Sequence, residues 1–175
     1  VLSEKEKRYV AYHESGHALI TYLLNQEVIH RISIIPRGKA LGFVLQTPDT
    51  DKNIYSKQEL QYKIMSILGG RGAEEVVFQN STTSAKNDLE KATEIALKMV
   101  SELGMGSLGL ISCAPLMLSY QVPIEVIQAA QLIVEDCYAQ VLALLTEHRA
   151  SLDRLAQSLM QREIITGEEM QALLS

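Results

Sequence analysis

The chain has 175 residues, of which 47% are hydrophobic and 21% are charged, so we expect one folded domain rather than a disordered segment. The 16 lysines and arginines against 21 aspartates and glutamates leave a net charge of −5, and tryptophan is absent. An acidic chain with few aromatic rings is not expected to bind nucleic acid, because phosphate recognition requires a basic surface. Two isolated cysteines, Cys113 and Cys137, exclude a disulfide scaffold and a cysteine-based zinc site.

No segment of the sequence is expected to span a membrane. The longest mostly apolar stretch, Leu108–Leu118, is about half as long as the roughly 20 residues that a bilayer requires. No signal peptide is visible. Because the chain begins at Val1 rather than methionine, we expect it to be a piece of a longer protein.

The first half of the chain is expected to contain two long helices separated by two short strands. Ser3 followed by Glu6, and Ser56 followed by Glu59, are capping-box pairs that are typical of helix starts. The expected elements are a helix at 3–25, strands at 29–35 and 42–46, and a helix at 56–77. We expect the second helix to be broken or tightly packed around Gly69.

The second half is expected to be helical apart from an irregular segment at 110–122. One helix is predicted from apolar residues at steps of three and four: Leu89, Ala92, Ala96, Met99 and Leu103. Pro123 is expected to be the first residue of a long helix to about His148, and shorter helices follow at 151–162 and 167–174. The prediction is therefore a mainly α single domain, 1–175, with a small two- or three-stranded β element, a catalytic part at 1–109 and a C-terminal helical part at 123–175.

The strongest functional signal is the motif His13-Glu14-Ser15-Gly16-His17. Four residues make nearly one helical turn, so the two imidazoles project from the same face and can bind one Zn²⁺. Glu14 is rotated by about 100° from His13, so it can reach a water on the metal and act as general base. Gly16 is expected to leave room for substrate beside the metal.

A catalytic zinc needs a third protein ligand, and the candidates are Asp88 and the pair Glu74 and Glu75. Asp88 borders the apolar stripe of its helix, where an unpaired carboxylate is costly. The two glutamates lie late in their helix, where the dipole disfavours acids, so one of them could pair with Arg71 or orient a metal-bound histidine. Position alone slightly favours Asp88 as the ligand, and Glu75 is expected to orient a histidine.

Several motifs, in order, closely resemble the protease domain of the FtsH family of membrane-anchored ATP-dependent zinc metalloproteases. They are HESGHA at 13–18, IIPRG at 34–38, ALG at 40–42, LGGR at 68–71, AEE at 73–75, TT at 82–83, NDL at 87–89, AT at 92–93, GM at 104–105 and HR at 148–149. The resemblance covers nearly the whole chain. It implies a mainly helical fold, zinc held by His13, His17 and Asp88, and Glu14 as general base.

The resemblance also implies partners and a location. It implies a homo-hexamer, an ATPase domain upstream, unfolded polypeptide substrates, and a membrane anchor that places this domain on the cytoplasmic, stromal or matrix side. This chain contains neither the ATPase module nor the transmembrane helices, and its segment at 110–122 is shorter than the usual connection. Four positions depart from the usual motif residues without removing a ligand or the base: Ser15, Gly72, Ser84 and Lys86.

The short strand at 42–46 is a candidate substrate site. Gly42, Phe43, Val44 and Leu45 could pair through their backbones with an extended substrate, which would give sequence-tolerant binding. The alternative is a purely structural hairpin with the strand at 29–35, and the sequence does not decide between them. His30 is expected to make a structural hydrogen bond, because it lies outside the metal-binding spacing.

These features favour a zinc-dependent endopeptidase that cleaves unfolded or membrane-extracted polypeptides. Two alternatives stay open at this point, namely a catalytically silent oligomerisation module and a zinc peptidase that works without an ATPase. The intact Glu14 favours an enzyme, because a silent module has no reason to keep the base.

Overall fold

The computed structural model describes residues 2–116 and 121–175. Their helices are α1 (Glu4–Leu24), α2 (Lys57–Phe78), α3 (Lys86–Ser101), α4 (Ile124–Glu147), α5 (Arg149–Arg162) and α6 (Gly167–Leu174). The strands are β1 (Glu27–Ser33), β2 (Phe43–Pro48) and β3 (Ile164–Thr166), and short 3₁₀ turns lie at Thr83–Ala85 and Ala114–Leu116. This architecture confirms the expected mainly helical fold with a small β element.

The two long N-terminal helices start where the capping signals predict. At the start of α1, the Ser3 hydroxyl accepts from the Glu6 backbone at 3.2 Å, and the Glu6 carboxylate accepts from the Ser3 backbone at 3.1 Å. At the start of α2, the Ser56 hydroxyl accepts from the Glu59 backbone at 3.1 Å. The helix α2 continues without a break past Gly69, so of the two expectations for this region, a break or tight packing, tight packing is the correct one.

The C-terminal helices begin at slightly different residues from those predicted. Pro123 precedes α4 as its cap instead of forming its first turn. The helix α5 begins at Arg149 instead of Ser151, because the chain already turns at His148, the one residue between α4 and α5. The irregular segment at 110–122 includes the turn Ala114–Leu116, and its residues 117–120 lie outside the described part of the chain.

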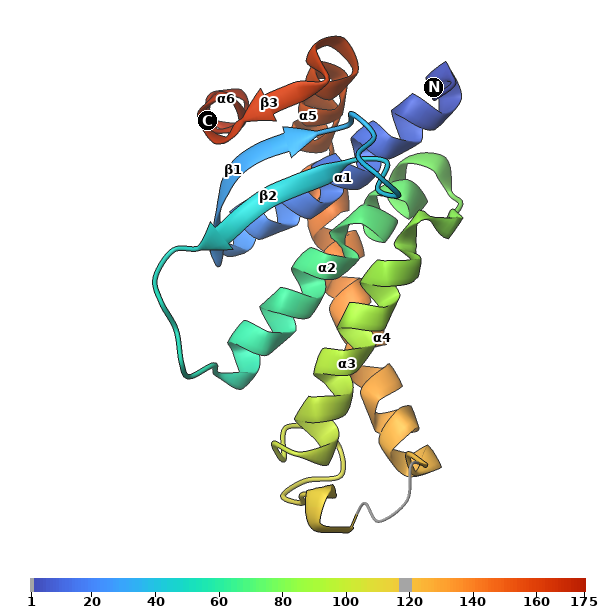
Figure 1. Cartoon of the computed structure of the whole chain (residues 1–175), viewed down its shortest axis with the longest axis vertical. Helices are drawn as coiled ribbons and strands as arrows, with labels where there is room; N and C mark the ends of the chain where they lie inside the picture. Colours follow the sequence, from blue (N-terminus) through green and yellow to red (C-terminus); the bar gives the residue numbers. More distant parts are fainter. Residues whose placement is uncertain (1, 117–120) are drawn as a thin grey trace.

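The sheet is antiparallel, and its strand order is β2-β1-β3. The strand β3 had no counterpart in the prediction, because three residues between two helices carry no period-two signal; Ile165 is nevertheless buried opposite Ile32. The sheet lies along α1, and β2 is the outer strand on the side of α2 and α3 (Figure 1). Among the described residues β2 pairs with β1 alone, so its other edge is free.

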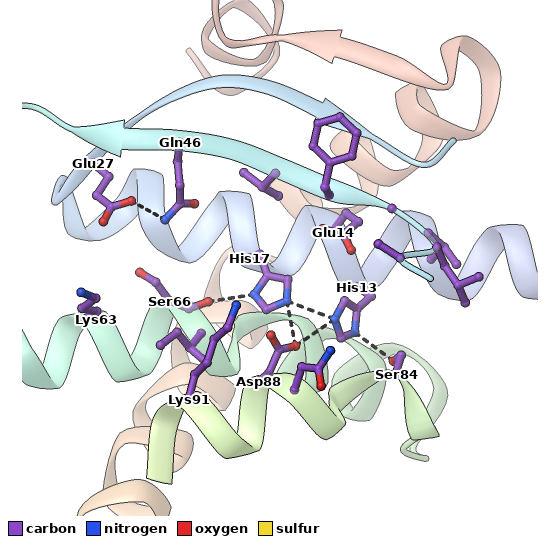
Figure 2. Close-up of a pocket in the computed structure, with 18 of the residues that line it drawn as sticks. His13, Glu14, His17, Glu27, Gln46, Lys63, Ser66, Ser84, Asp88 and Lys91 are labelled. Carbon is purple, nitrogen blue, oxygen red and sulfur yellow. Dashed lines mark hydrogen bonds and ion pairs between the residues drawn. The ribbon is translucent and has the colours of Figure 1, made fainter. Parts of the chain in front are cut away.

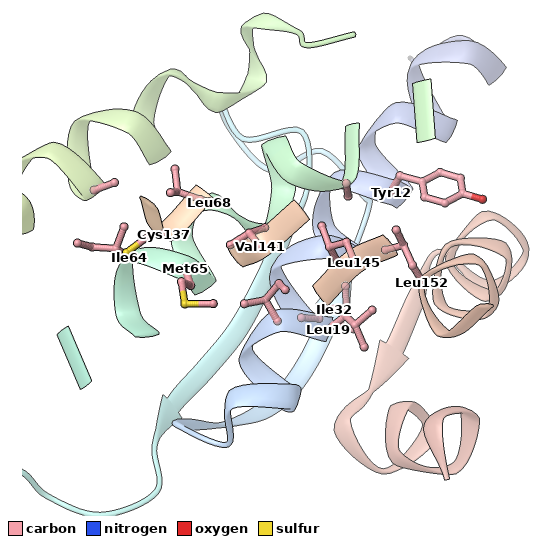
Figure 3. Packing of buried hydrophobic residues seen from close by; sticks show 14 of the residues in the cluster. Tyr12, Leu19, Ile32, Ile64, Met65, Leu68, Cys137, Val141, Leu145 and Leu152 are labelled. Carbon is pink, nitrogen blue, oxygen red and sulfur yellow. The ribbon is translucent and has the colours of Figure 1, made fainter. Parts of the chain in front are cut away.

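The core joins the N-terminal helices, the sheet and the C-terminal helices into one cluster (Figure 3). Leu19 of α1, Leu68 of α2 and Leu145 of α4 are each no more than 1% exposed. By length and composition alone, α4 could cross a membrane. However, its residues Cys137, Val141 and Leu145 are part of the core, so we assign α4 to the folded domain.

The helices α1 and α2 approach each other closely at two glycines. A Cβ atom on Gly16 would lie 2.2 Å from the Gly69 carbonyl oxygen and 2.6 Å from the Ala73 Cβ. Gly16 therefore permits the contact between α1 and α2. The expectation that Gly16 clears space for substrate is wrong, because this position faces α2 rather than the groove.

Candidate metal centre

Three side chains from two helices converge on one point below β2 (Figure 2). His13 and His17 project from one face of α1, and Asp88 reaches them from the first turn of α3. The Nε2 atoms of the histidines are 3.0 Å apart and lie 3.2 and 3.1 Å from Asp88 Oδ2. Ligand atoms at about 2.0–2.1 Å from a tetrahedral zinc are roughly 3.3 Å apart, so the triangle has the size of one face of such a site.

The other ring nitrogen of each histidine is held by an acceptor. His17 Nδ1 lies 2.9 Å from the Ser66 carbonyl oxygen, and His13 Nδ1 lies 3.0 Å from Glu74 Oε2. A backbone carbonyl oxygen can only accept, so the proton of His17 belongs on Nδ1, and the carboxylate favours the same tautomer of His13. With Nδ1 turned to an acceptor in each ring, Nε2 is the nitrogen that a metal would bind, which is the usual arrangement of metal-binding histidines.

The glutamate that contacts a histidine is Glu74, not Glu75. Glu74 is fully buried, whereas Glu75 is exposed. Consecutive helical residues are rotated by about 100°, so the two glutamates cannot both face α1. The expectation that Glu75 orients a metal-bound histidine is therefore corrected to Glu74.

Glu74 is the centre of a small hydrogen-bonded cluster that the sequence did not indicate. Its Oε1 accepts from the Thr82 hydroxyl, and its Oε2 accepts from the Ser84 hydroxyl at 3.1 Å as well as from His13. Thr82 and Ser84 belong to the turn that leads into α3. The cluster therefore connects the turn before Asp88 with His13, which Asp88 also contacts.

The charges at the site favour a cation between the carboxylates. Burial opposes a charge on His13, but hydrogen bonds to Asp88 and Glu74 outweigh it and raise the pKa of His13 to about 10. Burial likewise opposes ionisation of Asp88, yet its hydrogen bonds to His13 and His17 hold its pKa well below the usual range. The donor set of two imidazoles and one carboxylate is one that catalytic Zn²⁺ prefers, so these residues fit the metal.

Glu14 lies beside this triangle and forms no hydrogen bond with its three side chains (Figure 2). It is 8% exposed and lines the same cavity as His13, His17 and Asp88. Burial raises the pKa of Glu14, although the neighbouring His17 and His13 oppose the shift. Gly42 borders Glu14 directly, because a Cβ on this glycine would lie 3.0 Å from Glu14 Cγ.

Gly70 of α2 makes room for the two histidines. A Cβ atom there would lie 2.5 Å from His13 Nε2 and 2.6 Å from His17 Nε2. A side chain at this position would therefore overlap with the Nε2 atoms of His13 and His17. Glu74 lies four residues after Gly70, on the same face of α2. This spacing is the signal by which the sequence could have identified Glu74, rather than Glu75, as the glutamate that faces His13.

The site opens into a cavity of about 1560 Å³ between β2 and the helices α2 and α3. Gly42, Phe43 and Val44 line this cavity, whereas Leu45 does not. This part of β2 therefore lies beside the same cavity as His13, His17 and Asp88. His30 is remote from them, with Nε2 at 2.7 Å from the Thr47 hydroxyl, as expected for a structural histidine.

Comparisons with known proteins agree with this geometry. A sequence model described as "Peptidase family M41" matches residues 1–173. The chain is 42% identical to an ATP-dependent zinc metalloprotease FtsH of Pseudothermotoga lettingae, over 99% of this chain and 30% of that protein. It is 41% identical to the FtsH of Thermotoga maritima over the whole chain, and 36% identical to that of Bacillus subtilis over 99%.

The chain thus spans about 30% of the length of these relatives. The matches nevertheless cover both the part that carries the histidines and the C-terminal helices. They confirm the resemblance that the motifs indicate. The chain belongs to peptidase family M41.

Proposed function

We propose that this domain is a zinc-dependent endopeptidase in which His13, His17 and Asp88 hold the metal and Glu14 is the general base. The observation that supports this most strongly is the triangle of ligand atoms, 3.0–3.2 Å on a side, with Glu14 beside it and free of it. Three protein ligands leave a fourth position open, as a catalytic zinc requires.

Zinc, when bound, supplies a water of lowered pKa and polarises the peptide carbonyl. Glu14 accepts the proton of the attacking water and delivers it to the leaving nitrogen. Burial raises the pKa of Glu14, which makes its carboxylate a stronger base than that of an exposed glutamate. The low exposure of Glu14 also keeps bulk water from competing for that proton.

We propose that the substrate is an extended, unfolded polypeptide that adds a strand to the free edge of β2. Every residue except proline offers the same backbone donor and acceptor, so such pairing tolerates many sequences. Gly42 lies against Glu14, which brings the start of this edge next to the base.

The decisive experiment replaces Glu14 by glutamine. The variant should retain zinc, measured by metal analysis, and lose about 10²–10⁴-fold in casein hydrolysis, which is typical of removing a general base. The parental protein with and without a chelator is the control. A variant that cleaves casein at the parental rate would refute the assignment of Glu14, and a zinc-loaded parental protein without any hydrolysis would instead support the silent oligomerisation module.

We further propose that the domain works in a membrane-anchored homo-hexamer together with an ATPase domain. Support comes from the relatives, which are named ATP-dependent, and from apolar side chains on α4 that remain exposed, such as Ile124 at 58% and Leu132 at 60%. Light scattering after size exclusion measures the assembly. A monomer at all concentrations would show that this domain does not assemble by itself.

A further inference from the structure

The groove beside the metal site is rich in lysine, although the chain as a whole has a net charge of −5. The lysines that line it are Lys5, Lys39, Lys52, Lys63, Lys86 and Lys91. Apart from Glu14 and Asp88, whose charges a divalent cation would balance, the acids that line it are Glu6, Glu27, Asp49 and Glu59. Lysines therefore outnumber these acids, which is the reverse of the balance over the whole chain.

Two of these lysines are next to the chemistry. Lys91 follows Asp88 by three residues on α3, and Lys63 precedes Ser66 by three residues on α2. Asp88 is a metal ligand in the proposed site, and the Ser66 carbonyl accepts from His17. Each lysine thus lies about one helical turn, roughly 5 Å of rise, from a residue that touches a metal-binding histidine.

Both ammonium groups are available to a ligand. Lys52 pairs with Glu59, whereas the ion pairs of the described residues include neither Lys63 nor Lys91. Lys63 Nζ lies 5.7 Å from the centre of the Tyr55 ring, which steadies the side chain without neutralising it. In Figure 2 the two lysines lie on the floor of the groove on the His17 side, opposite Glu27 and Gln46 of the sheet.

An extended substrate along β2 would present alternate side chains to this floor, with a rise of about 3.3 Å per residue. A side chain one to three residues from the scissile bond would then reach the two lysines. We propose that Lys63 and Lys91 form a subsite that selects an acidic side chain, aspartate or glutamate, on the His17 side of the scissile bond. This inference rests on the proposed peptidase function and names a substrate class within it.

The test uses quenched fluorescent peptides that are blocked at both ends and differ at one position, which carries Glu, Gln or Lys. The substituted position is moved from three residues before to three residues after the scissile bond. A solvent-exposed charge pair contributes modestly, so kcat/KM for Glu should exceed that for Gln by about two- to fivefold at one or two positions on one side. The preference should shrink as NaCl is raised, because salt screens exposed charges.

Variants assign the preference to these side chains. Lys63→Gln or Lys91→Gln should bring the Glu/Gln ratio close to one, and Lys91→Glu should favour the Lys peptide. Lys98→Gln, on α3 but outside the cavity lining, is the matched control and should leave the ratio unchanged. Matched peptides with a free or amidated C-terminus show whether an α-carboxylate, rather than a side chain, is being bound.

Two failures are distinguishable. If neutral peptides are cleaved but the Glu/Gln ratio is one at every position, or survives both lysine substitutions, the subsite is refuted and the peptidase function stands. If neither the peptides nor casein are cleaved, the peptidase function fails. In that case the affinities of the Glu and Gln peptides for the zinc-loaded Glu14→Gln variant, measured by fluorescence polarisation, still decide whether the groove prefers an acidic side chain.

Discussion

At the scale of single residues, the role of each acid at the candidate metal centre depends on its position in the fold as well as on its residue type. Glu74 and Glu75 are chemically identical, yet one is buried against His13 and the other is exposed. Asp88 meets both histidines within 3.2 Å. The substitution of each acid should therefore affect zinc binding to a different degree.

We predict that Asp88→Asn weakens zinc binding by more than about 100-fold, and that Glu74→Gln weakens it by about 10–100-fold, as is typical for a partner of a metal-binding histidine. Glu75→Gln is the matched control, and its zinc affinity should remain parental. Competition with a chromogenic chelator measures all three affinities. Parental affinity in Asp88→Asn would exclude Asp88 as a ligand.

Gly70 is also predicted to be necessary for full zinc affinity. Gly70→Ala would place a Cβ atom 2.5 Å from His13 Nε2, so zinc affinity should fall at least about tenfold while circular dichroism remains helical, because alanine favours helices by about 1 kcal/mol. Gly72→Ala is the matched control. Its Cβ would meet Val141 in the core at 2.6 Å, so it should lower the melting temperature without a specific effect on zinc. Equal zinc affinity in both variants would contradict the prediction.

At the scale of elements, the site is built where α1, α2 and α3 meet under the edge of β2. The close contact of Gly16 with Gly69 brings α1 and α2 together, and the cluster around Glu74 fixes the turn that starts α3. The strand β2 closes the groove from the other side and leaves one edge free.

Proline on β2 tests whether this edge binds substrate. Val44→Pro or Leu45→Pro removes one backbone donor, and the variant whose N–H faces the groove should lose peptide cleavage while it retains zinc. The other variant should disturb the pairing with β1, so circular dichroism and zinc content must accompany the assay. Full casein cleavage by two folded, zinc-loaded proline variants would count against strand addition.

At the scale of the whole molecule, the proposed metal ligands come from helices that are distant in the sequence, so zinc binding should stabilise the entire domain. At a free zinc concentration about 100 times Kd, the free energy of unfolding should rise by about 2.7 kcal/mol. For a chain of this size that corresponds to an increase of about 5–10 °C in the melting temperature.

Thermal denaturation with zinc and with a chelator measures this increase. Glu14→Gln should show the parental increase, because Glu14 is not a ligand, whereas Asp88→Asn should show little of it. An equal increase in Asp88→Asn would mean that zinc stabilises the domain from a different site.

The sequence by itself determined those features that depend on local spacing. The pair His13 and His17 lies on one helical face because the 3.6-residue period places it there, and Ser3 and Ser56 start their helices because their hydroxyls satisfy free backbone amides. The helical class and the approximate bounds of the long helices follow from the same local rules.

The tertiary structure decided everything that depends on which helix faces meet. Position in the sequence slightly favoured Asp88 as third ligand, but its approach to histidines more than 70 residues away depends on how α3 packs. The same packing selected Glu74 over Glu75, turned Gly16 towards α2, and added β3 to the sheet through pairing with β1. Local periodicity states which residues share a face of one element, but the partner of that face is set by the packing of the whole chain.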